Sequence, residues 1–288
     1  MRSEARLGSW RLMRFVPFIL LTPSLALVLL LFLYPLLRLI VESFFDPSPG
    51  FGNYVAVVTD PTLWQIIETT VIISTQCTVA TLLPAYPVSY LLSRLPKTQA
   101  NLLMMFVLLP FWTSLLVRMY AWMVLLGRHG IINEALISLG ITAAPHQLLY
   151  DRFAVVVGMS HFLLPFMVLS LYSTMLGIDR SLIDAASSMG SSFLQTFLRI
   201  YLPLSLPGVY SGCLLVFILG MGFYITPALL GSPQETTISV YIQQQIQELN
   251  WGEGTAMAVI LVAIVVALFA AYDRIFGFDR LFRGVGTQ

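Results

Sequence analysis

Long, uninterrupted apolar runs constrain this sequence more than any other feature. The first is Phe15–Val41, and five more follow at about 63–92, 102–126, 153–176, 209–229 and 256–276. A bilayer core of about 30 Å needs about 20 helical residues, so these runs are long enough to cross a membrane. They are continuous rather than alternating, which favours helices over a β-barrel. The sequence therefore predicts an all-α, polytopic membrane protein with six transmembrane helices.

Composition excludes several other classes of protein. The chain of 288 residues is 58% hydrophobic and 10% charged, whereas soluble domains carry about 25% charged residues. A net charge of +1 provides no basic surface for nucleic acid. Cys77 and Cys213 both fall inside apolar runs, where we expect buried small hydrophobes rather than a disulfide or a metal pair. The three histidines show no ligand spacing, so no metal site is predicted: His129, His146 and His161.

The first apolar run follows a basic N-terminal tail, residues 1–14, which has four arginines and one acid, Glu4. A cleaved signal peptide is one alternative, because residues 23–26 resemble a cleavage region. The run stays apolar well beyond that point, and we therefore expect an uncleaved membrane anchor.

Lys and Arg are divided unequally between the two sets of connecting segments. One set consists of the N-terminal tail, the 93–101 and 177–208 loops and the C-terminal end, with a tail at 277–288. It carries Arg2, Arg6, Arg11, Arg14, Arg94, Lys97, Arg180, Arg199, Arg274, Arg280 and Arg283. The opposite set consists of the 42–62, 127–152 and 230–255 loops, and it carries only Arg128 and Arg152. Because cytoplasmic segments are enriched in Lys and Arg, both termini and the 177–208 loop are predicted to be cytoplasmic.

The last outer loop has three acids and no Lys or Arg: Glu235, Glu248 and Glu253. Within it, residues 237–251 place apolar side chains at helical spacing. We expect a short amphipathic helix at the outer surface, which either packs on the rim of the bundle or contacts a partner.

The polar stretch Ser181–Pro207 lies between the fourth and fifth apolar runs and has helical character. Gly190 is near its centre, where the end of a helix tolerates a residue without Cβ. We predict two short helices hinged at Gly190, with Pro203 and Pro207 stopping the second. Each helix is expected to start with a capping box, made by Ser181 with Asp184 and by Ser192 with Gln195.

A motif in this stretch resembles the EAA motif of ABC importer permeases. It reads Asp184-Ala185-Ala186, three residues, Gly190, nine residues, then Ile200-Tyr201-Leu202-Pro203. Every spacing matches, and the one departure is Asp184 where the family usually has Glu. The resemblance implies that 181–198 forms coupling helices that dock on a separate ATPase. The docking residues would be Asp184, Ala185, Ala186, Gly190, Ile200, Leu202 and Pro203. An alternative is that these small residues only pack a cytoplasmic helical hairpin.

A second resemblance extends from about Asn53 to the last span, and it concerns the spermidine/putrescine branch of these permeases. It is carried by the segments 109–114, 118–122, 130–133, 164–166, 226–231 and 250–251. The resemblance implies the type I, MetI-like importer permease fold in a bacterial inner membrane. It also implies a cytoplasmic ATPase dimer, a second, similar permease subunit and a periplasmic substrate-binding protein as partners. The substrate would be a small amine, although the branch also includes opine and 4-aminobutyrate-like permeases.

No enzyme activity is expected of this chain. It lacks the Gly-x-x-x-x-Gly-Lys-Ser/Thr phosphate loop, and its only lysine is Lys97. ATP and Mg²⁺ are therefore expected on the partner ATPase, with no cofactor on this chain. The alternative is a self-sufficient secondary transporter of amines or amino acids. Such a protein needs coupling-ion sites near the membrane midplane, and these spans are poor in acids.

Arg118 is the most unusual residue within a span, because a charge near the bilayer centre costs at least about 2.5–3.5 kcal/mol. A straight helix from Asn101 would place it about 25 Å along the span, toward the outer end. Three interpretations stay open: pairing with a carboxylate, lining the outer mouth of the pathway, or snorkelling to the headgroups. Glu68, about one turn into the second span, is a candidate counter-charge for Arg118 or for a cationic substrate, or a rim-exposed acid.

Aromatic residues near Arg118 and in the fifth span are further pathway candidates: Tyr120, Trp122, Phe223 and Tyr224. Their rings are suited to an ammonium group through cation–π attraction, or they form an interfacial aromatic belt. Pro110, Pro165 and Pro227 are expected to break or kink their spans, which exposes carbonyl groups to a pathway or is absorbed by helix packing.

Overall fold

A computed structural model describes residues 21–46 and 48–276, and every regular element within those residues is helical. Six helical segments there are long and apolar enough to cross a membrane: Leu21–Phe45, Pro61–Arg94, Leu115–Ser138, Arg152–Leu176, Phe193–Met221 and Trp251–Arg274. The predicted all-α architecture with six membrane-crossing segments is therefore confirmed. The predicted tails at 1–14 and 277–288, and the first part of the first span, lie outside the described residues.

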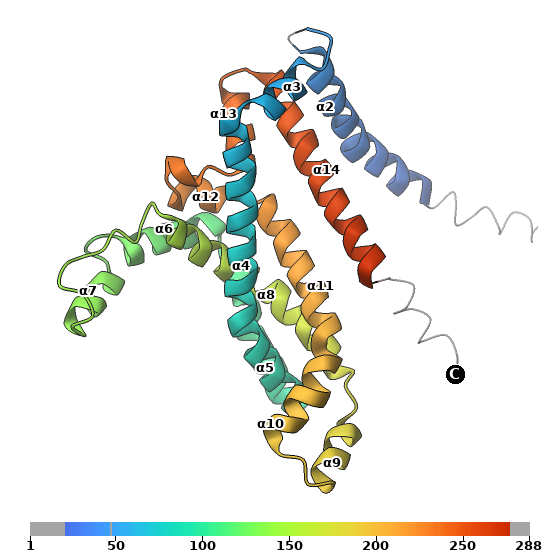
Figure 1. Cartoon of the computed structure of the whole chain (residues 1–288), viewed down its shortest axis with the longest axis vertical. Helices are drawn as coiled ribbons and strands as arrows, with labels where there is room; N and C mark the ends of the chain where they lie inside the picture. Colours follow the sequence, from blue (N-terminus) through green and yellow to red (C-terminus); the bar gives the residue numbers. More distant parts are fainter. Residues whose placement is uncertain (1–20, 47, 277–288) are drawn as a thin grey trace, which may run out of the picture.

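The helices follow one another with short connections (Figure 1). In chain order they are α2 (Tyr34–Phe45), α3 (Gly52–Thr59), α4 (Pro61–Arg94), α5 (Lys97–Trp112), α6 (Leu115–Leu126), α7 (Ile131–Ser138), α8 (Arg152–Leu176), α9 (Arg180–Ser188), α10 (Phe193–Thr196), α11 (Leu202–Met221), α12 (Ile225–Leu230), α13 (Ile238–Gln247) and α14 (Trp251–Phe276). A π-helical turn at Leu29–Leu33 precedes α2, another at Phe197–Tyr201 joins α10 to α11, and a 3-10 turn at Pro233–Glu235 precedes α13.

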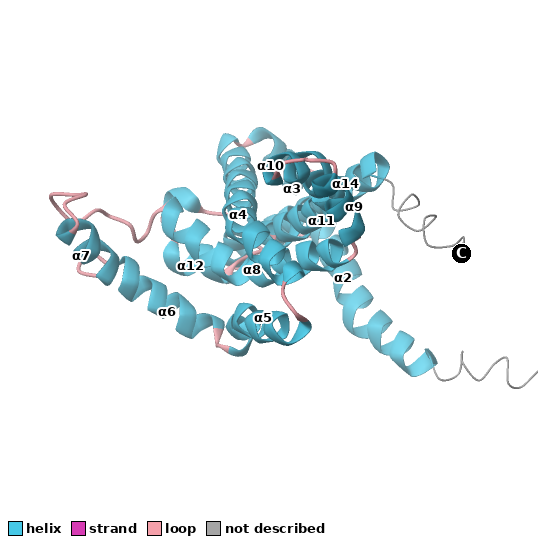
Figure 2. Cartoon of the chain, turned by 90° about the horizontal axis from the view of Figure 1, so that it is seen from below, coloured by secondary structure: helices cyan, strands magenta, loops and turns pink. Residues whose placement is uncertain are grey.

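Helices α4, α8 and α11 pack together as the centre of the bundle (Figures 1 and 2). Their shared core is apolar and fully buried, for example at Cys77, Met159 and Leu163. Small residues allow the close approach of these helices, as is usual within membranes. A Cβ atom at Gly208 of α11 would lie 2.8 Å from Thr174 of α8, so any larger residue there forces the two helices apart.

Helices α2 and α14 pack against each other beside this centre (Figure 1). At the upper end of Figure 1, the backbone N–H of Gly252 donates to the Asp46 carboxylate, with N and Oδ2 2.8 Å apart. The amphipathic helix predicted at 237–251 is present as α13. Its residue Ile238 is fully buried, and α13 packs on α14 and α4. The helix therefore packs on the rim of the bundle.

The third predicted span, 102–126, is wrong as one continuous helix. Thr113 and Ser114 have extended backbones, so α5 ends at Trp112 and α6 starts in a new direction at Leu115. Pro110 has no N–H to continue the helical ladder. Side chains then take the carbonyl groups at the break: the Thr113 hydroxyl donates to the Pro110 carbonyl at 3.0 Å, and Arg118 Nη2 donates to the Thr113 carbonyl at 3.1 Å.

The fifth span also differs from the prediction of 209–229. Pro203 and Pro207 do not stop the preceding helix, because α10 runs through the π-helical turn Phe197–Tyr201 into α11. Within that turn the Leu202 N–H donates to the Phe197 carbonyl five residues earlier. Such a wider turn lets a helix continue past a proline. The span ends at Met221 rather than at residue 229, and a bend at 222–224 separates it from α12.

Candidate functional site

The end of the molecule opposite α13 is formed by α9 and α10, residues Arg180–Thr196, and we call it the tip (Figure 1). Helix α9 is capped by Asp179, whose Oδ1 accepts from the Ser181 N–H at 2.9 Å. Hydrogen bonds from the backbone and the side chain of Ser181 hold the pKa of the Asp179 carboxyl below its usual value. The predicted capping box of Ser181 with Asp184 is therefore wrong. The N-cap is Asp179, two residues before Ser181, and Asp184 is an exposed residue on the second turn of the helix.

Gly190 ends α9 in a left-handed conformation, with φ +83°. Two hydrogen bonds close the helix: Ser191 N–H donates to the Ala186 carbonyl, and Gly190 N–H donates to the Ser187 carbonyl, both at 3.0 Å. This pattern is a Schellman motif, which satisfies carbonyl groups that a helix end leaves free. No heavy atom lies within 4 Å of the position that a Cβ of Gly190 would occupy. The predicted hinge is confirmed, and backbone conformation rather than space requires glycine there.

Ser192 starts α10 with the predicted capping box. Gln195 N–H donates to the Ser192 hydroxyl, and the Gln195 side chain accepts from the Ser192 N–H. The tip then presents large apolar side chains to the outside, with Met189 88% and Phe193 71% exposed. An exposed apolar surface beside small residues is typical of a protein–protein contact.

The residues of the DAA–G–IxLP motif fall into two structural groups. Asp184 and Ala185 are exposed on α9, and Ala186 is half-buried. Ile200, Leu202 and Pro203 belong instead to the base of the fifth span, where Ile200 and Leu202 are half-buried. The first group is therefore exposed at the tip, whereas the second belongs to the helix that connects the tip to the bundle.

An aromatic cluster that the sequence analysis missed joins the tip to α4. Tyr90 packs edge-on against Phe197 and Tyr201, at centroid distances of 6.0 and 4.9 Å. The Arg94 guanidinium lies 5.2 Å from the Tyr90 ring centroid and 5.6 Å from that of Tyr201. The Ser93 hydroxyl and the Tyr201 hydroxyl are hydrogen-bonded at 3.0 Å. We call these five residues the clamp.

The clamp also receives a hydrogen bond from the tip, because Arg180 Nη2 donates to the Ser93 carbonyl at 2.9 Å. The spacing of the clamp residues in the sequence is the signal that could have predicted them. Tyr90 and Arg94 are four residues apart on one helix, and Phe197 and Tyr201 are four apart on the other. Residues at this spacing lie on one helix face, so two such pairs indicate two facing stripes.

The structure buries Arg118, whose exposed fraction is 8%, so snorkelling to the headgroups is wrong. The helix break at 113–114 redirects α6, and the estimate from a straight helix no longer applies. The guanidinium lies 5.2 Å from the Phe162 ring centroid. Its Nε and Nη1 atoms are buried without a hydrogen-bond partner, and the described residues place no carboxylate in an ion pair with it.

The other pathway candidates do not gather into one site. Trp122 is half-buried and donates through Nε1 to His161 Nδ1 at 3.3 Å. Tyr120 is 61% exposed, and Glu68 is exposed on α4. Tyr224 lies at the bend before α12 and is 38% exposed. Only Trp122 and Arg118 share a neighbourhood, through the adjacent residues His161 and Phe162 of α8.

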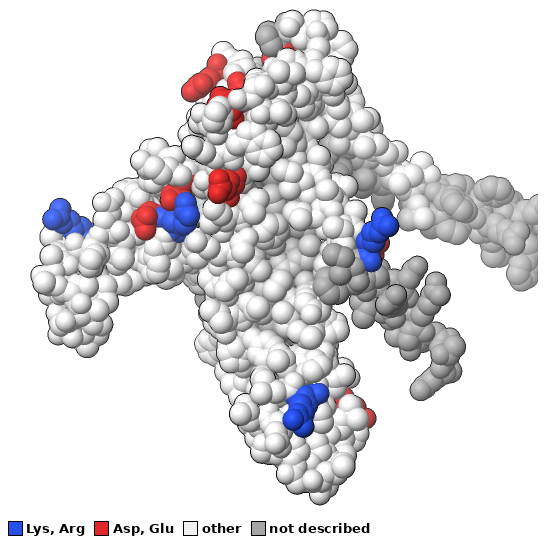
Figure 3. Space-filling model, in the orientation of Figure 1, with Lys and Arg blue, Asp and Glu red and all other residues white. Residues whose placement is uncertain are grey.

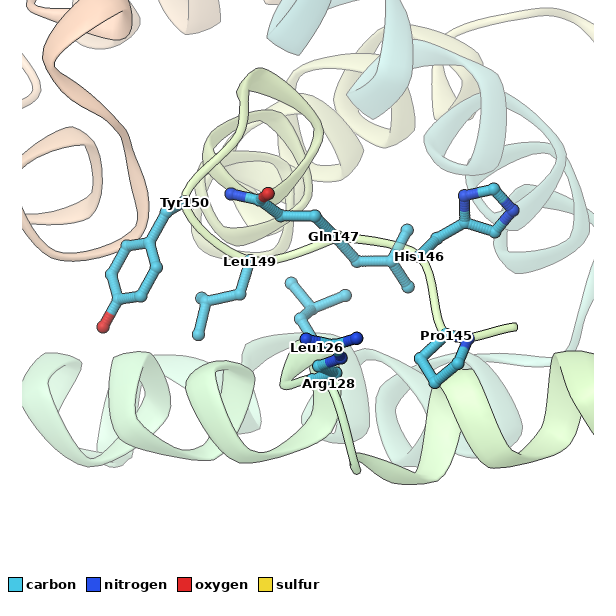
Figure 4. A pocket seen from close by; sticks show the side chains of 8 residues that line it. Leu126, Arg128, Pro145, His146, Gln147, Leu149 and Tyr150 are labelled. Atoms are coloured by element: carbon cyan, nitrogen blue, oxygen red, sulfur yellow. The ribbon is translucent and has the colours of Figure 1, made fainter.

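A cavity of about 490 Å³ lies beside the loop that connects α7 to α8 (Figure 4). Asn133 organises this loop, since its side chain donates to the Gly127 and His146 carbonyls and accepts from the His146 N–H. Arg128 and Tyr150 contribute polar groups to the lining. No group of three or more His, Cys, Asp or Glu suited to a metal ion occurs in residues 21–46 and 48–276.

Comparison with known proteins identifies the family. The model of the family described as "Binding-protein-dependent transport system inner membrane component" matches residues 2–278. The chain belongs to this family. It is thus the permease subunit of an ABC importer and not an enzyme, and nothing supports a self-sufficient secondary transporter. The EAA-type motif at 184–203 is typical of these permeases.

Two relatives of this permease share about a third of its sequence. It is 36% identical to spermidine/putrescine transport system permease protein PotB of Haemophilus influenzae over 216 residues, which is 75% of this chain and 76% of that protein. It is 34% identical to PotB of Escherichia coli over 223 residues, covering 77% and 81% of the two chains.

Solved importer structures share the fold of the permease. A bacterial alginate ABC transporter, in complex with a periplasmic protein bound to an alginate pentasaccharide, matches with a TM-score of 0.74 at 17% identity, covering 93% of this chain and 96% of that one. The MetNI methionine ABC transporter matches with a TM-score of 0.55 at 17% identity, covering 75% and 97%. The predicted type I importer fold is confirmed.

Proposed function

We propose that this permease imports a small amine, a polyamine such as putrescine or spermidine. The observation that carries the proposal is its similarity to two permeases named for spermidine and putrescine, over three quarters of the chain. Aromatic residues near the middle of the bundle, such as Trp122 and Phe162, fit the transport of ammonium groups, which are attracted to ring faces.

The tip would face the cytoplasm and dock on a dimer of ATPase subunits, which bind the ATP and Mg²⁺. The distribution of charge supports this orientation. At the tip end Arg94, Lys97, Arg180 and Arg199 outnumber the two acids Asp179 and Asp184, whereas only acids lie over α13 and the start of α14 (Figure 3). Lys and Arg are enriched on the cytoplasmic side of membrane proteins. Both chain termini would then be cytoplasmic as well.

Two further partners complete the proposed importer. A second, similar permease subunit would form the other half of the membrane domain. A periplasmic binding protein would deliver the substrate to the end formed by α3 and α13. The chain itself would bind no cofactor.

Transport would proceed by alternating access. When ATP draws the ATPase subunits together, the tip moves with them as a rigid body, because the caps at Asp179, Gly190 and Ser192 fix its short helices. The clamp passes this motion to α4 at the centre of the bundle. The spans then switch between inward-open and outward-open states, and substrate falls inward after hydrolysis.

The test is uptake of radiolabelled putrescine and spermidine by proteoliposomes that hold this permease assembled with its ATPase, second permease and binding-protein partners. Uptake should require ATP and should fail with a non-hydrolysable analogue. Uptake that proceeds without ATP, or an importer that takes up neither amine, overturns the proposal.

Docking at the tip has its own variant and a matched control. Ala185 on α9 and Ala143 in the loop after α7 are both exposed. Ala185→Arg should abolish co-purification of the ATPase, because a long charged side chain separates the two surfaces. Ala143→Arg makes the same change away from the tip, beside α7, and should leave the complex intact. An ATPase that stays bound to the Ala185→Arg variant contradicts docking at this surface.

A further inference from the structure

A second cavity lies inside the membrane-crossing part of the permease, between α4, α6 and α8, and has a volume of about 320 Å³. This is the lower end of the range of about 300–1,000 Å³ that small-molecule sites occupy. The lining has no Asp or Glu and includes Ala80, Pro84, Trp122, Ser160, His161 and Leu164. Ala80 lies about 29 Å along α4, a helix of about 50 Å, so the cavity is near the middle of that span.

Prolines free two backbone carbonyl groups in this lining. A proline has no N–H, so the carbonyl four residues earlier in the helix loses its donor. Pro84 acts in this way on Ala80 in α4, and Pro165 acts on His161 in α8. Ala80 and His161 both line the same cavity. Two helices therefore each contribute a lining residue whose carbonyl group has lost its helical partner.

The hydroxyl groups in the wall have already used their protons. Ser160 Oγ and Thr81 Oγ1 both donate to the carbonyl of Cys77, at 3.5 and 2.6 Å. A hydroxyl has one proton to donate and two lone pairs that accept. Thr81 is fully buried, whereas Ser160 is partly exposed, so Ser160 presents an acceptor to the cavity.

Trp122 and His161 complete the lining. His161 Nδ1 accepts the Trp122 N–H, so the ring is the neutral tautomer with its proton on Nε2 and adds no positive charge. The Trp122 ring offers a π face, and tryptophan attracts cations better than other aromatic residues do. Acceptor oxygens and a π face, without an acid, are complementary to a group that has both positive charge and several N–H donors.

We propose that this cavity binds one primary ammonium group of the substrate, through the Ala80 and His161 carbonyls, the Ser160 hydroxyl and the Trp122 ring. The proposal rests on the proposed function and adds the place where the amine is held within this chain. Arg118 is outside the lining, but its guanidinium lies against Phe162, next to His161. Its positive charge opposes tight retention, so binding is weak. A transport pathway requires that property, because a site must also release its ligand.

The test is a ligand-observed NMR titration of the full chain in lipid nanodiscs with n-butylammonium and with neutral n-butanol. The parent protein should bind the ammonium and not the alcohol. Pro84→Ala and Pro165→Ala restore a helical N–H to the Ala80 and His161 carbonyls. Each should raise the Kd for n-butylammonium roughly tenfold, the value of about one hydrogen bond to a charged group.

Pro87→Ala is the matched control. It makes the same change in α4, but the carbonyl that it affects belongs to Leu83, which is 70% exposed and does not line the cavity. Its Kd should stay within about twofold of the parent, since no hydrogen bond to the ligand is lost. Trp122→Leu, which removes the π face without altering any carbonyl, should also weaken binding. Equal affinity for n-butanol, no effect of Pro84→Ala and Pro165→Ala, or an equal effect of Pro87→Ala overturns the site.

Failure of the site and failure of the proposed function give different results. If the assembled importer takes up putrescine while the proline variants bind n-butylammonium like the parent, the site is wrong and the function stands. If the importer takes up no amine while the parent shows proline-dependent binding, the site stands and the proposed function is wrong.

Discussion

Replacement of Gly190 provides the sharpest test of how the tip is built. The residue has φ +83°, and a left-handed backbone costs an L-residue about 1–2 kcal/mol. This strain weakens the two hydrogen bonds that close α9, from Gly190 N–H to the Ser187 carbonyl and from Ser191 N–H to the Ala186 carbonyl. A free energy of 1–2 kcal/mol corresponds to a factor of about 5–30 in a local opening equilibrium.

Gly190→Ala should therefore raise the hydrogen-exchange rate of the Ser191 amide about 5–30-fold, measured on the permease in nanodiscs. Gly190→Asn is the informative comparison. Asparagine is larger than alanine, but it visits the left-handed region more readily. Because no atom lies within 4 Å of a Cβ at this position, its volume carries no penalty. The rise for asparagine should be smaller, under about fivefold.

The order of these two variants decides the argument. If Gly190→Asn opens the tip more than Gly190→Ala does, steric space and not backbone conformation explains the glycine. If Gly190→Ala exchanges at the rate of the parent, the left-handed conformation is not what holds the end of α9. In the assembled importer, the same ranking should appear as a loss of substrate uptake per ATP hydrolysed.

Three further sets of variants test the clamp, the cap of α9 and the ion pair of Arg152 with Glu235. Tyr201→Phe keeps the aromatic ring but removes the hydrogen bond to Ser93, so it should lower the free energy of unfolding by about 1 kcal/mol. It should also lower the uptake per ATP without releasing the ATPase. Unchanged uptake per ATP would exclude transmission through the clamp. Asp179→Ala should speed amide exchange at the start of α9, and Asp179→Asn should restore much of the protection. Since folding lowers the pKa of Asp179, the part of its stabilisation that depends on its charge is present above the unfolded value of about 3.9 and is lost as the pH falls through the folded value. Protection at the start of α9 that does not fall at all on acidification would contradict a charged cap. The ion pair of Arg152 Nε with Glu235 Oε2, at 2.8 Å, is partly buried, so Arg152→Met should lower the melting temperature. The double variant with Glu235→Gln should recover part of that loss. Additive losses in this double-mutant cycle would show that the two side chains are independent.

Local sequence determined much of the architecture. Hydropathy over windows of about 20 residues located six membrane-crossing segments, because each span must satisfy its own backbone and match the bilayer. Short-range chemistry also identified Gly190 as the residue at the end of the first tip helix and the Ser192 capping box. These features depend on residues within about five positions of each other.

Errors in the prediction have a common cause. Ser181 with Asp184 satisfies the pattern of a capping box, but Asp179 starts the helix two residues earlier in the chain than Ser181 and takes the free N–H groups first. Hydropathy likewise does not register the break at Thr113, because the residues on both sides are apolar. Two nearby caps differ by only a few hydrogen bonds, and so do a straight and a broken span. A sequence pattern does not tell which of the two alternatives is more stable.

The sequence by itself determined the family-typical motif, the number of spans and the short helices of the tip. Only the tertiary structure decided that Arg118 is buried against Phe162, that the clamp joins the tip to α4, and that Ala80 and His161 line one cavity. Each of these depends on which faces of distant helices meet. That choice is made by packing between segments tens of residues apart, where local propensity and hydropathy carry no information.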